Sequence, residues 1–131
     1  MPQPETQPGG TKALGACGEA QAAEYLVAQG YRIAETNVRP LPGFARGEID
    51  IVAYDGDVLC FIEVKTRRSG TDAAAESVNP AKRRQLVVLA EAYLSTREIG
   101  ANVMCRFDVV AISAKCGVPH ITLYRDAFSP E

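Results

Sequence analysis

The sequence predicts an α/β fold in which a mixed β-sheet is covered by helices, and three observations lead to that prediction. Two segments carry apolar residues at helical spacing, the other regular segments are almost continuously apolar, and an Asp-Gly pair separates two of those. Strands covered by helices on both faces have this continuous apolar character. The predicted order is one helix, three strands, a second helix and two strands. A chain of 131 residues is long enough for one such domain.

The first helix is predicted from about Thr11 to Gln29, directly before Gly30, because glycine commonly follows the last residue of a helix. Ahead of it, residues 1 to about 12 are rich in Pro, Gln, Gly and Thr and lack apolar periodicity. This composition predicts a disordered tail at 1–12 before a single domain at 13–131. The small and apolar residues of the helix form one stripe, composed of Leu14, Gly18, Ala22, Tyr25 and Leu26.

Three strands are predicted after this helix. Residues 31–38 alternate weakly between apolar and polar side chains and form the first strand, which a loop rich in proline and glycine follows. The other two strands, at about 46–54 and 57–67, are joined by the Asp-Gly pair and form a β-hairpin.

The turn of this hairpin predicts which residues lie opposite one another. Asp55-Gly56 suits a two-residue type I′ turn, so Tyr54 is expected to pair with Asp57. The opposite pairs in this register are Glu48–Glu63, Asp50–Phe61 and Arg46–Lys65. Alternation along the strands then predicts two faces. One face carries Ile49, Ile51, Ala53, Cys60, Ile62 and Val64, and the other carries Glu48, Asp50, Glu63 and Lys65 with Val52, Leu59 and Phe61.

A second helix is predicted to begin after Asn79, with Pro80 at its first position, and to run to about Glu98 before Gly100. A loop of small and polar residues at 69–77 precedes it. The apolar stripe of this helix consists of Leu86, Leu89, Ala90, Tyr93 and Leu94.

Two strands complete the predicted sheet. Residues 104–112, MCRFDVVAI, form the fourth, and residues 120–124, HITLY, form a short fifth after a turn at 117–119. Arg106 and Asp108 share one face of the fourth strand. Their simplest interpretation is a structural ion pair.

Composition excludes several classes of protein. The apolar fraction of 47% and the charged fraction of 23% are those of a soluble globular domain, and the longest apolar runs are too short to span a bilayer. The first residues lack the basic start and apolar core of a signal peptide. The four cysteines are widely separated, which favours free thiols in a reducing compartment over disulfides or zinc. A cytoplasmic protein is therefore expected.

The charged face of the predicted hairpin needs an explanation, because charge on a covered strand is costly. Glu48, Asp50 and Glu63 are expected within one or two strand spacings of one another, and Lys65 alone cannot neutralise them. One explanation is a lattice of salt bridges on a solvent-exposed face, although Phe61 on the same face favours a covered one. The other explanation is a divalent cation held by oxygen ligands, which would remove the repulsion between the carboxylates.

Glu19 is a candidate to complete such a site. It lies at the edge of the apolar stripe of the first helix and has no basic residue three or four positions away. Docking of that stripe on the sheet would bring Glu19 towards the hairpin acids. The alternative is a glutamate at the rim of an alanine-rich helix.

The basic residues indicate a binding surface less directly. A formal net charge of −2 argues against a generic nucleic-acid-binding protein. Two clusters of basic residues could nevertheless follow a nucleic-acid backbone, the second of them from the start of the second helix, although solvated charged faces are the alternative. The clusters consist of Lys65, Arg67 and Arg68, and of Lys82, Arg83 and Arg84.

Taken together, these features resemble the PD-(D/E)xK nuclease superfamily. The resemblance rests on Asp50, followed after twelve residues by Glu63-Val64-Lys65, behind a helix that carries Glu19. The predicted order matches the superfamily's restriction-endonuclease-like αβββαβ core, although Glu-Ile-Asp stands where the motif has Pro-Asp. More closely, the chain resembles the YraN-like family of small bacterial proteins. The matching segments are LGACGEAQAAEYL, GEIDIVAYDGDVLCFIEVKTR, VNPAKRRQL, RFDVVAI and HITLYRDAF.

The resemblance implies a role for each acid and for one lysine. Asp50 and Glu63 would bind Mg²⁺ or Mn²⁺ together with the Val64 carbonyl, and Glu19 would hold a metal-bound water or a second ion. Lys65 would orient or help deprotonate the attacking water and would offset the charge of the phosphorane. Glu48 would support these residues.

The function implied is that of a metal-dependent endonuclease that hydrolyses phosphodiesters in DNA, in branched or recombination intermediates. Archaeal Holliday-junction resolvases are the nearest relatives of known activity that the pattern suggests, and by analogy with them a homodimer is expected. Two alternatives stay open: a catalytically inactive nucleic-acid-binding or scaffold module on the same fold, and a nuclease directed at RNA. The intact set of Asp50, Glu63 and Lys65 favours an enzyme over the inactive module.

Overall fold

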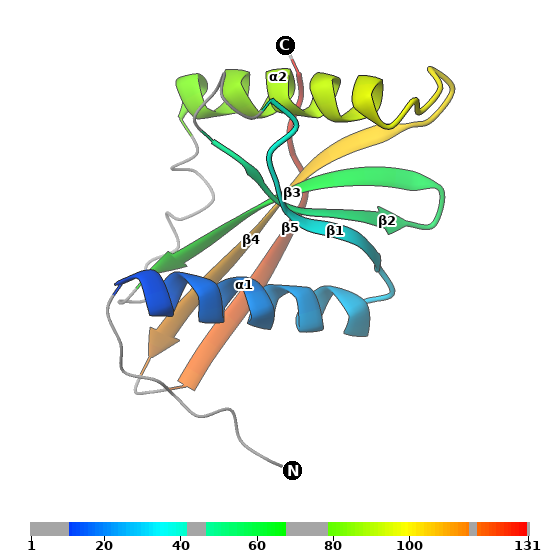
Figure 1. Ribbon diagram of the computed structural model, residues 1–131. Helices are drawn as coiled ribbons and strands as arrows, with labels where there is room; N and C mark the ends of the chain where they lie inside the picture. Colours follow the sequence, from blue (N-terminus) through cyan, green and yellow to red (C-terminus); the bar gives the residue numbers. More distant parts are fainter. Residues whose placement is uncertain (1–10, 42–46, 68–78, 116–117, 131) are drawn as a thin grey trace.

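The computed structural model of the chain describes residues 11–41, 47–67, 79–115 and 118–130 (Figure 1). Its helices and strands follow the predicted order, so the α/β class is confirmed, and the fold is compatible with the restriction-endonuclease-like class. Most of the predicted tail and the predicted loop at 69–77 lie outside the described residues. The elements are α1 (Thr11–Ala28), β1 (Arg32–Val38), β2 (Ile49–Asp55), β3 (Val58–Arg67), α2 (Pro80–Thr96), β4 (Cys105–Lys115) and β5 (Val118–Phe128).

The strands form one mixed sheet in the order β1-β2-β3-β4-β5. Strands that are neighbours in this order pair antiparallel, except that β3 and β4 run parallel. A parallel pair needs a long crossover connection, and α2 lies in that connection. The hairpin of β2 and β3 therefore lies inside the sheet, with β1 and β5 at its edges.

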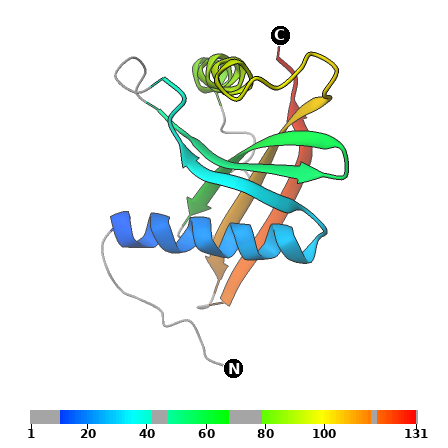
Figure 2. The same cartoon turned by 45° about the vertical axis from the view of Figure 1, so that its right-hand side comes forward.

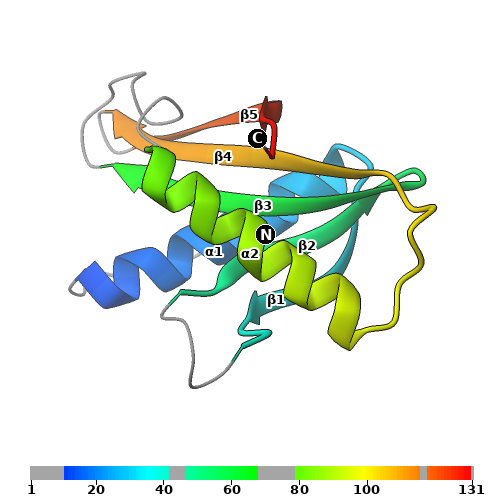
Figure 3. The same ribbon diagram turned by 90° about the horizontal axis from the view of Figure 1, so that it is seen from above.

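The two helices cover opposite faces of the sheet (Figures 2 and 3). On one face, Ala22 and Leu26 of α1 pack in a buried cluster with sheet residues that include Ile62. On the other, Leu86 and Leu89 of α2 pack in a second cluster with its own set of sheet residues. The predicted helix stripes are thus confirmed where the structure describes them. This two-sided cover explains why the strands are apolar almost throughout.

The hairpin turn lies one residue further along the chain than predicted. Asp55 pairs with Val58, so Gly56 and Asp57 form the two-residue turn and the predicted pairing of Tyr54 with Asp57 is wrong. Gly56 has a φ of 62°, a left-handed conformation that glycine adopts at little cost. Glycine therefore occupies the first position of the turn, which is the position that requires a left-handed backbone.

This shift changes the partners of the acidic residues but not the alternation of faces, because it moves each partner by two residues. Ile51 pairs with Ile62, so the next position along each strand places Asp50 opposite Glu63. The predicted pairs Asp50–Phe61 and Glu48–Glu63 are wrong, and Arg46 lies outside the described residues.

Ile49 departs from the predicted alternation. It packs in the cluster under α2 rather than with Ile51, and so does Val38, its partner on β1. Asn37, directly before Val38, has a φ of 53°, and a left-handed residue interrupts the regular pleat of a strand. The irregularity lies beside Asp50, so the regular alternation ends at the acidic site.

The last two strands are longer than predicted. β4 extends past residue 112 to Lys115, and β5 begins at Val118, so Val118 and Pro119 are strand residues rather than a turn. The prediction failed because it treated Pro119 as a strand breaker. Proline is tolerated at the start of an edge strand, and β5 is an edge.

Candidate metal centre

Carboxylates from three segments of the chain, which include the first helix and the hairpin strand β2, lie close together. Glu19 comes from α1, Glu48 directly precedes β2, and Asp50 is the second residue of β2. One carboxylate oxygen of each residue lies within 4.8 Å of those of the other two. Metal–oxygen bonds of about 2.1 to 2.5 Å would allow one divalent cation to contact all three. Glu48, predicted to play a supporting role, thus lies as near to Asp50 as a ligand would.

A fourth carboxylate, that of Glu63 on β3, lies beside this group. The backbone N–H of Val64 donates a hydrogen bond to Oδ2 of Asp50 at 2.8 Å, which ties the two hairpin strands together at the site. Glu63 is only 6% exposed, and its Oε1 is buried without a hydrogen-bond partner among the described residues. A buried carboxylate oxygen in this state is rare and costly.

Two lysines approach the other oxygen of Glu63. The Nζ of Lys65 lies 3.9 Å from Oε2, and the Nζ of Lys82, in the first turn of α2, lies 3.7 Å from the same atom. Both distances exceed those of an ordinary hydrogen bond. The structure thus brings Lys65 beside Glu63 and adds Lys82, which sequence analysis had assigned to a nucleic-acid backbone.

Burial disfavours the charged forms of Asp50 and Glu63, the two paired acids of the hairpin. Burial, and next the charge of Glu63, raise the pKa of Asp50 to about 7, against the opposing effect of the Val64 N–H. Burial also raises the pKa of Glu63, although the ammonium groups of Lys82 and Lys65 act in the opposite direction. A positive charge at this position would relieve both carboxyl groups.

The residues present fit a hard divalent cation. Carboxylate oxygens are the ligands that Mg²⁺ and Mn²⁺ prefer in proteins. Asp50 is partly buried, Glu63 is buried, and the unpartnered Oε1 of Glu63 offers an acceptor that no described donor uses. Glu19 and Glu48 supply further oxygens within ligand distance of Asp50.

Asn37 and Arg39 are site residues that sequence analysis missed. The Nδ2 of Asn37 donates to Oε1 of Glu19 at 2.7 Å and to Oε2 of Glu48 at 3.2 Å. Its backbone is left-handed, with a φ of 53°. The Nε of Arg39 lies 3.5 Å from Oε1 of Glu48. The sequence signal for Asn37 was weak. It consisted of the general tendency of asparagine to adopt a left-handed conformation more readily than most residues.

Two glycines allow the helices to approach the site. A Cβ atom at Gly18, directly before Glu19, would overlap Cγ2 of Thr66, so a larger residue there would force Thr66 or α1 to shift. Gly47, directly before Glu48, has a φ of 127°, and a Cβ there would overlap the side-chain amide of Gln85 on α2. Each glycine thus permits the close packing of the backbone directly before one of the acids of the site.

Two further basic residues of the prediction, Arg83 and Arg84, line a groove beside α2. Both are exposed, and the groove, which Val87 also lines, has a volume of about 400 Å³ between α2 and the residues after β5. The Arg83 guanidinium also lies over the ring of Phe128, 5.7 Å from its centre. Arg67 ends β3, and Arg68 lies outside the described residues.

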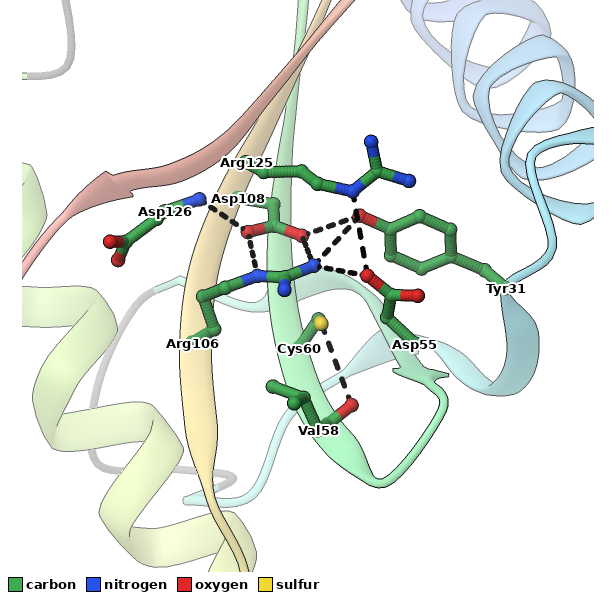
Figure 4. Close-up of polar contacts among 8 residues, drawn as sticks. All are labelled: Tyr31, Asp55, Val58, Cys60, Arg106, Asp108, Arg125 and Asp126. Atoms are coloured by element: carbon green, nitrogen blue, oxygen red, sulfur yellow. Dashed lines mark hydrogen bonds and ion pairs between the residues drawn. The ribbon is translucent and has the colours of Figure 1, made fainter.

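A second polar cluster lies on the face of the sheet covered by α1, towards the hairpin turn (Figure 4). Asp108 is fully buried, and its carboxylate accepts hydrogen bonds from Nε and Nη2 of Arg106, from the hydroxyl of Tyr31 and from the N–H of Asp126. Arg106 also donates to Asp55 at 2.8 Å. The predicted structural pair of Arg106 and Asp108 is confirmed and is part of a larger network.

The pKa shifts in this second cluster follow from satisfied partners and from burial. The hydrogen bond to Asp108 is the main cause that raises the pKa of Arg106, and the hydrogen bond from Arg106 lowers the pKa of Asp55. Burial, followed by the hydrogen bond to Asp108, raises the pKa of Tyr31. Burial raises the pKa of the free thiol of Cys60 to about 12, so this thiol is unreactive at neutral pH.

Comparison with known proteins assigns the chain to a family. The model of the family described as "Uncharacterised protein family UPF0102" matches residues 18–112, which contain the whole acidic site. The chain belongs to the UPF0102 family. This is the YraN-like family that the sequence resembles, so that prediction is confirmed.

Relatives in several bacteria support this membership. A UPF0102 protein of Chlorobaculum parvum is 54% identical over 102 residues, which cover 77% of this chain and 75% of that protein. One of Dehalococcoides mccartyi is 43% identical over 121 residues, 92% of this chain and 96% of that protein. Within the part of the UPF0102 chain that the structure describes, neither helix is long and apolar enough to cross a membrane.

Proposed function

We propose that this UPF0102 protein is a metal-dependent nuclease that hydrolyses phosphodiester bonds in nucleic acid. One observation carries the proposal above the others: a buried Glu63 oxygen, without a hydrogen-bond partner among the residues that the structure describes, lies beside the crowded carboxylates of Asp50, Glu19 and Glu48. A site with an unmet need for positive charge is suited to bind a cation and, through it, the anionic phosphate of a substrate.

The cation would be Mg²⁺ or Mn²⁺, held by Asp50 and Glu63 from the paired hairpin strands and by the carbonyl of Val64. Glu19 would hold a water or a second ion, and the position of Glu48 within ligand distance gives it a similar capacity. A divalent cation bound there would neutralise charge on phosphate oxygens and make water more acidic.

Lys65 would act on the substrate side of this arrangement. Its ammonium lies 3.9 Å from Glu63 and is about one quarter exposed, so it is at once held near the carboxylates and open to solvent. From that position, the ammonium could orient the attacking water, assist its deprotonation by stabilising the hydroxide that forms, and stabilise the negative charge that develops on the phosphorus oxygens.

DNA is the favoured substrate by resemblance to the Holliday-junction resolvases, with branched or recombination intermediates as the expected structures. Basic residues at the start of α2 would contact its backbone. An inactive nucleic-acid-binding module is the competing proposal, and the coexistence of Lys65 with both hairpin acids favours the enzyme. A homodimer and a cytoplasmic location are further parts of this proposal, the first by analogy with the resolvases and the second from the free thiols.

The experiment that tests it incubates purified protein with linear, nicked, flapped and four-way DNA and with RNA, in Mg²⁺ or Mn²⁺. Cleavage is expected in metal and not in chelator, and Asp50→Asn, purified identically, should lose it. If the wild type cuts nothing across this panel, or if Asp50→Asn cuts as well as the wild type, the nuclease proposal fails.

A further inference from the structure

Lys82 occupies an unusual position at the acidic site. Its ammonium and that of Lys65 lie 3.7 Å and 3.9 Å from one oxygen of Glu63, while the other oxygen of the same carboxylate has no hydrogen-bond partner among the residues described. Lys65 reaches this oxygen along its own strand, whereas Lys82 reaches it from α2. Two ammonium groups from different elements thus share one oxygen of a single carboxylate.

The place of Lys82 in the helix is unfavourable on local grounds. It lies in the first turn of α2, and its backbone N–H donates to the side chain of the capping residue Asn79 at 2.9 Å. The positive end of the helix dipole is at this terminus, so a cation here is repelled. The first turn of α2 contains no acidic residue to offset this. Within the described part of the chain, the ion pair with Glu63 on β3 compensates the charge of Lys82.

The ion pair between Lys82 and Glu63 is weak enough to break. A separation of 3.7 Å is too long for a strong hydrogen bond, and about one third of the Lys82 side chain is exposed, so a small rotation of its flexible stem moves the ammonium into solvent. Glu63, by contrast, is buried on a central strand and stays in place.

We infer that Lys82 is an internal counterion that occupies Glu63 when no metal is bound and is released to bind a substrate phosphate when a divalent cation arrives. The inference rests on the proposed metal site and adds to it a positioning residue from α2. A metal ion bound to Glu63 repels the ammonium, and the ammonium equally opposes the metal, because coupling between two binding events is reciprocal. Metal binding thereby prepares a cation for the nucleic acid.

The first test measures Mn²⁺ binding by calorimetry, without nucleic acid, for the wild type, Lys82→Met, Lys82→Arg and Arg84→Met. Arg84 is the matched control, because it is an exposed cation in the same turn of α2 that does not contact the acids. Lys82→Met should bind Mn²⁺ on the order of tenfold more tightly than the wild type. Lys82→Arg, which keeps the charge, should stay close to the wild type, and Arg84→Met should be unchanged.

The outcomes separate this inference from the proposal on which it depends. If the wild type binds no Mn²⁺ at the site, as judged against Asp50→Asn, both the metal site and the role of Lys82 fall. If the wild type binds Mn²⁺ but Lys82→Met and Arg84→Met have the same affinity, the metal site stands and the counterion role of Lys82 is wrong.

The second test asks whether the lysine is released to phosphate. Binding of a labelled duplex DNA is followed by stopped-flow anisotropy, within a time in which no product forms, in Mn²⁺ and in chelator. Lys82→Met should weaken binding several-fold more in Mn²⁺ than in chelator, whereas Arg84→Met should weaken it equally in both. Equal losses for Lys82→Met in the two conditions would overturn the release of Lys82 to the substrate.

Discussion

Two buried carboxylates on neighbouring strands have opposite surroundings. Glu63 of β3 pairs in register with Val109 of β4, and Asp108 of β4 pairs with Ile62, so the two acids lie one position apart along the sheet. Asp108 is on the face covered by α1, where arginine, tyrosine and backbone donors satisfy both of its oxygens. Glu63 shares the other face with Lys82 of α2, and one of its oxygens has no donor within the described part of the chain.

The difference teaches how to separate a structural charge from a functional one. Burial destabilises the charged form of both acids. For Asp108, hydrogen-bond and ion-pair partners within the protein offset this effect. Around Glu63, three more carboxylates add repulsion and two distant lysines only partly offset it. This contrast between a satisfied carboxylate and an unsatisfied one is the basis of the proposed cation site.

The largest effect expected from this comparison is on stability. Asp108→Asn should lower the free energy of unfolding by about 3 kcal/mol, because it leaves Arg106 and Tyr31 with an amide in place of their shared buried anion. Urea denaturation followed by circular dichroism would measure the change. A loss below about 0.5 kcal/mol would mean that the network is not structural.

The next largest effect concerns catalysis at the other acid. Lys65→Ala should reduce single-turnover cleavage by on the order of 10²-fold, because its ammonium would act on charge that develops in the transition state. Its affinity for nucleic acid should stay within a few-fold of the wild type. Arg84→Ala should do the reverse, with weaker and less salt-dependent binding and nearly normal cleavage at saturating protein. Equal losses of binding in both variants, without a change in cleavage, would make Lys65 only a part of a basic surface.

A smaller effect is expected on the pH dependence of the metal-free protein. The pKa of Asp50 is about 7 in the folded state and about 3.9 in an unfolded chain. Between these values the folded protein binds more protons than the unfolded chain, so this group makes stability fall as pH rises from about 4 to about 7. Denaturation in chelator across this range should show the fall, and Asp50→Asn should reduce it.

The same substitution allows a direct contrast with Asp108. At pH 8 in chelator, Asp50→Asn should raise the free energy of unfolding by up to about 1 kcal/mol, because it removes one of the repelling charges. Asp108→Asn should lower it under identical conditions. Destabilisation by both variants would show that the acidic site has no charge deficit.

The smallest effect is expected at Asn37. Asn37→Ala should cost about 1 kcal/mol, because alanine fits the left-handed backbone poorly, whereas Asn37→Gly should cost less. Both variants remove the amide that joins Glu19 to Glu48, so both should alter Mn²⁺ affinity to a similar extent. Thermal melts and calorimetry would separate the two contributions. If only the alanine variant changes Mn²⁺ affinity, the amide has no part in the site.

The sequence predicted the order of elements and the acids of the hairpin because both depend on local patterns. Continuous apolar strands and helical stripes identify a covered sheet, and Asp50, Glu63 and Lys65 stand out as charges within it. The fold and these candidates therefore needed no knowledge of tertiary contacts. Gly18 illustrates the limit: its place in a small-residue stripe was visible, but its close approach to Thr66 was not.

What the sequence could not predict depends on small shifts of geometry. Both Asp55-Gly56 and Gly56-Asp57 can form a two-residue turn, and the choice between them decides whether Asp50 faces Phe61 or Glu63. Asn37 has a left-handed backbone and donates hydrogen bonds to Glu19 and Glu48, and no local pattern in the sequence predicts either feature. Lys82 was assigned to a phosphate backbone because nothing in its local sequence shows that the start of α2 lies against Glu63.

The central claim, that the acidic site binds a divalent cation, is tested most directly by thermal melts of the wild type and Asp50→Asn with and without millimolar Mn²⁺. A ligand present at about 100 times its dissociation constant adds roughly 2.7 kcal/mol of stability. The melting temperature of the wild type should therefore rise clearly with Mn²⁺, and that of Asp50→Asn should not. Equal shifts in the two proteins, or no shift in either, would contradict the claim.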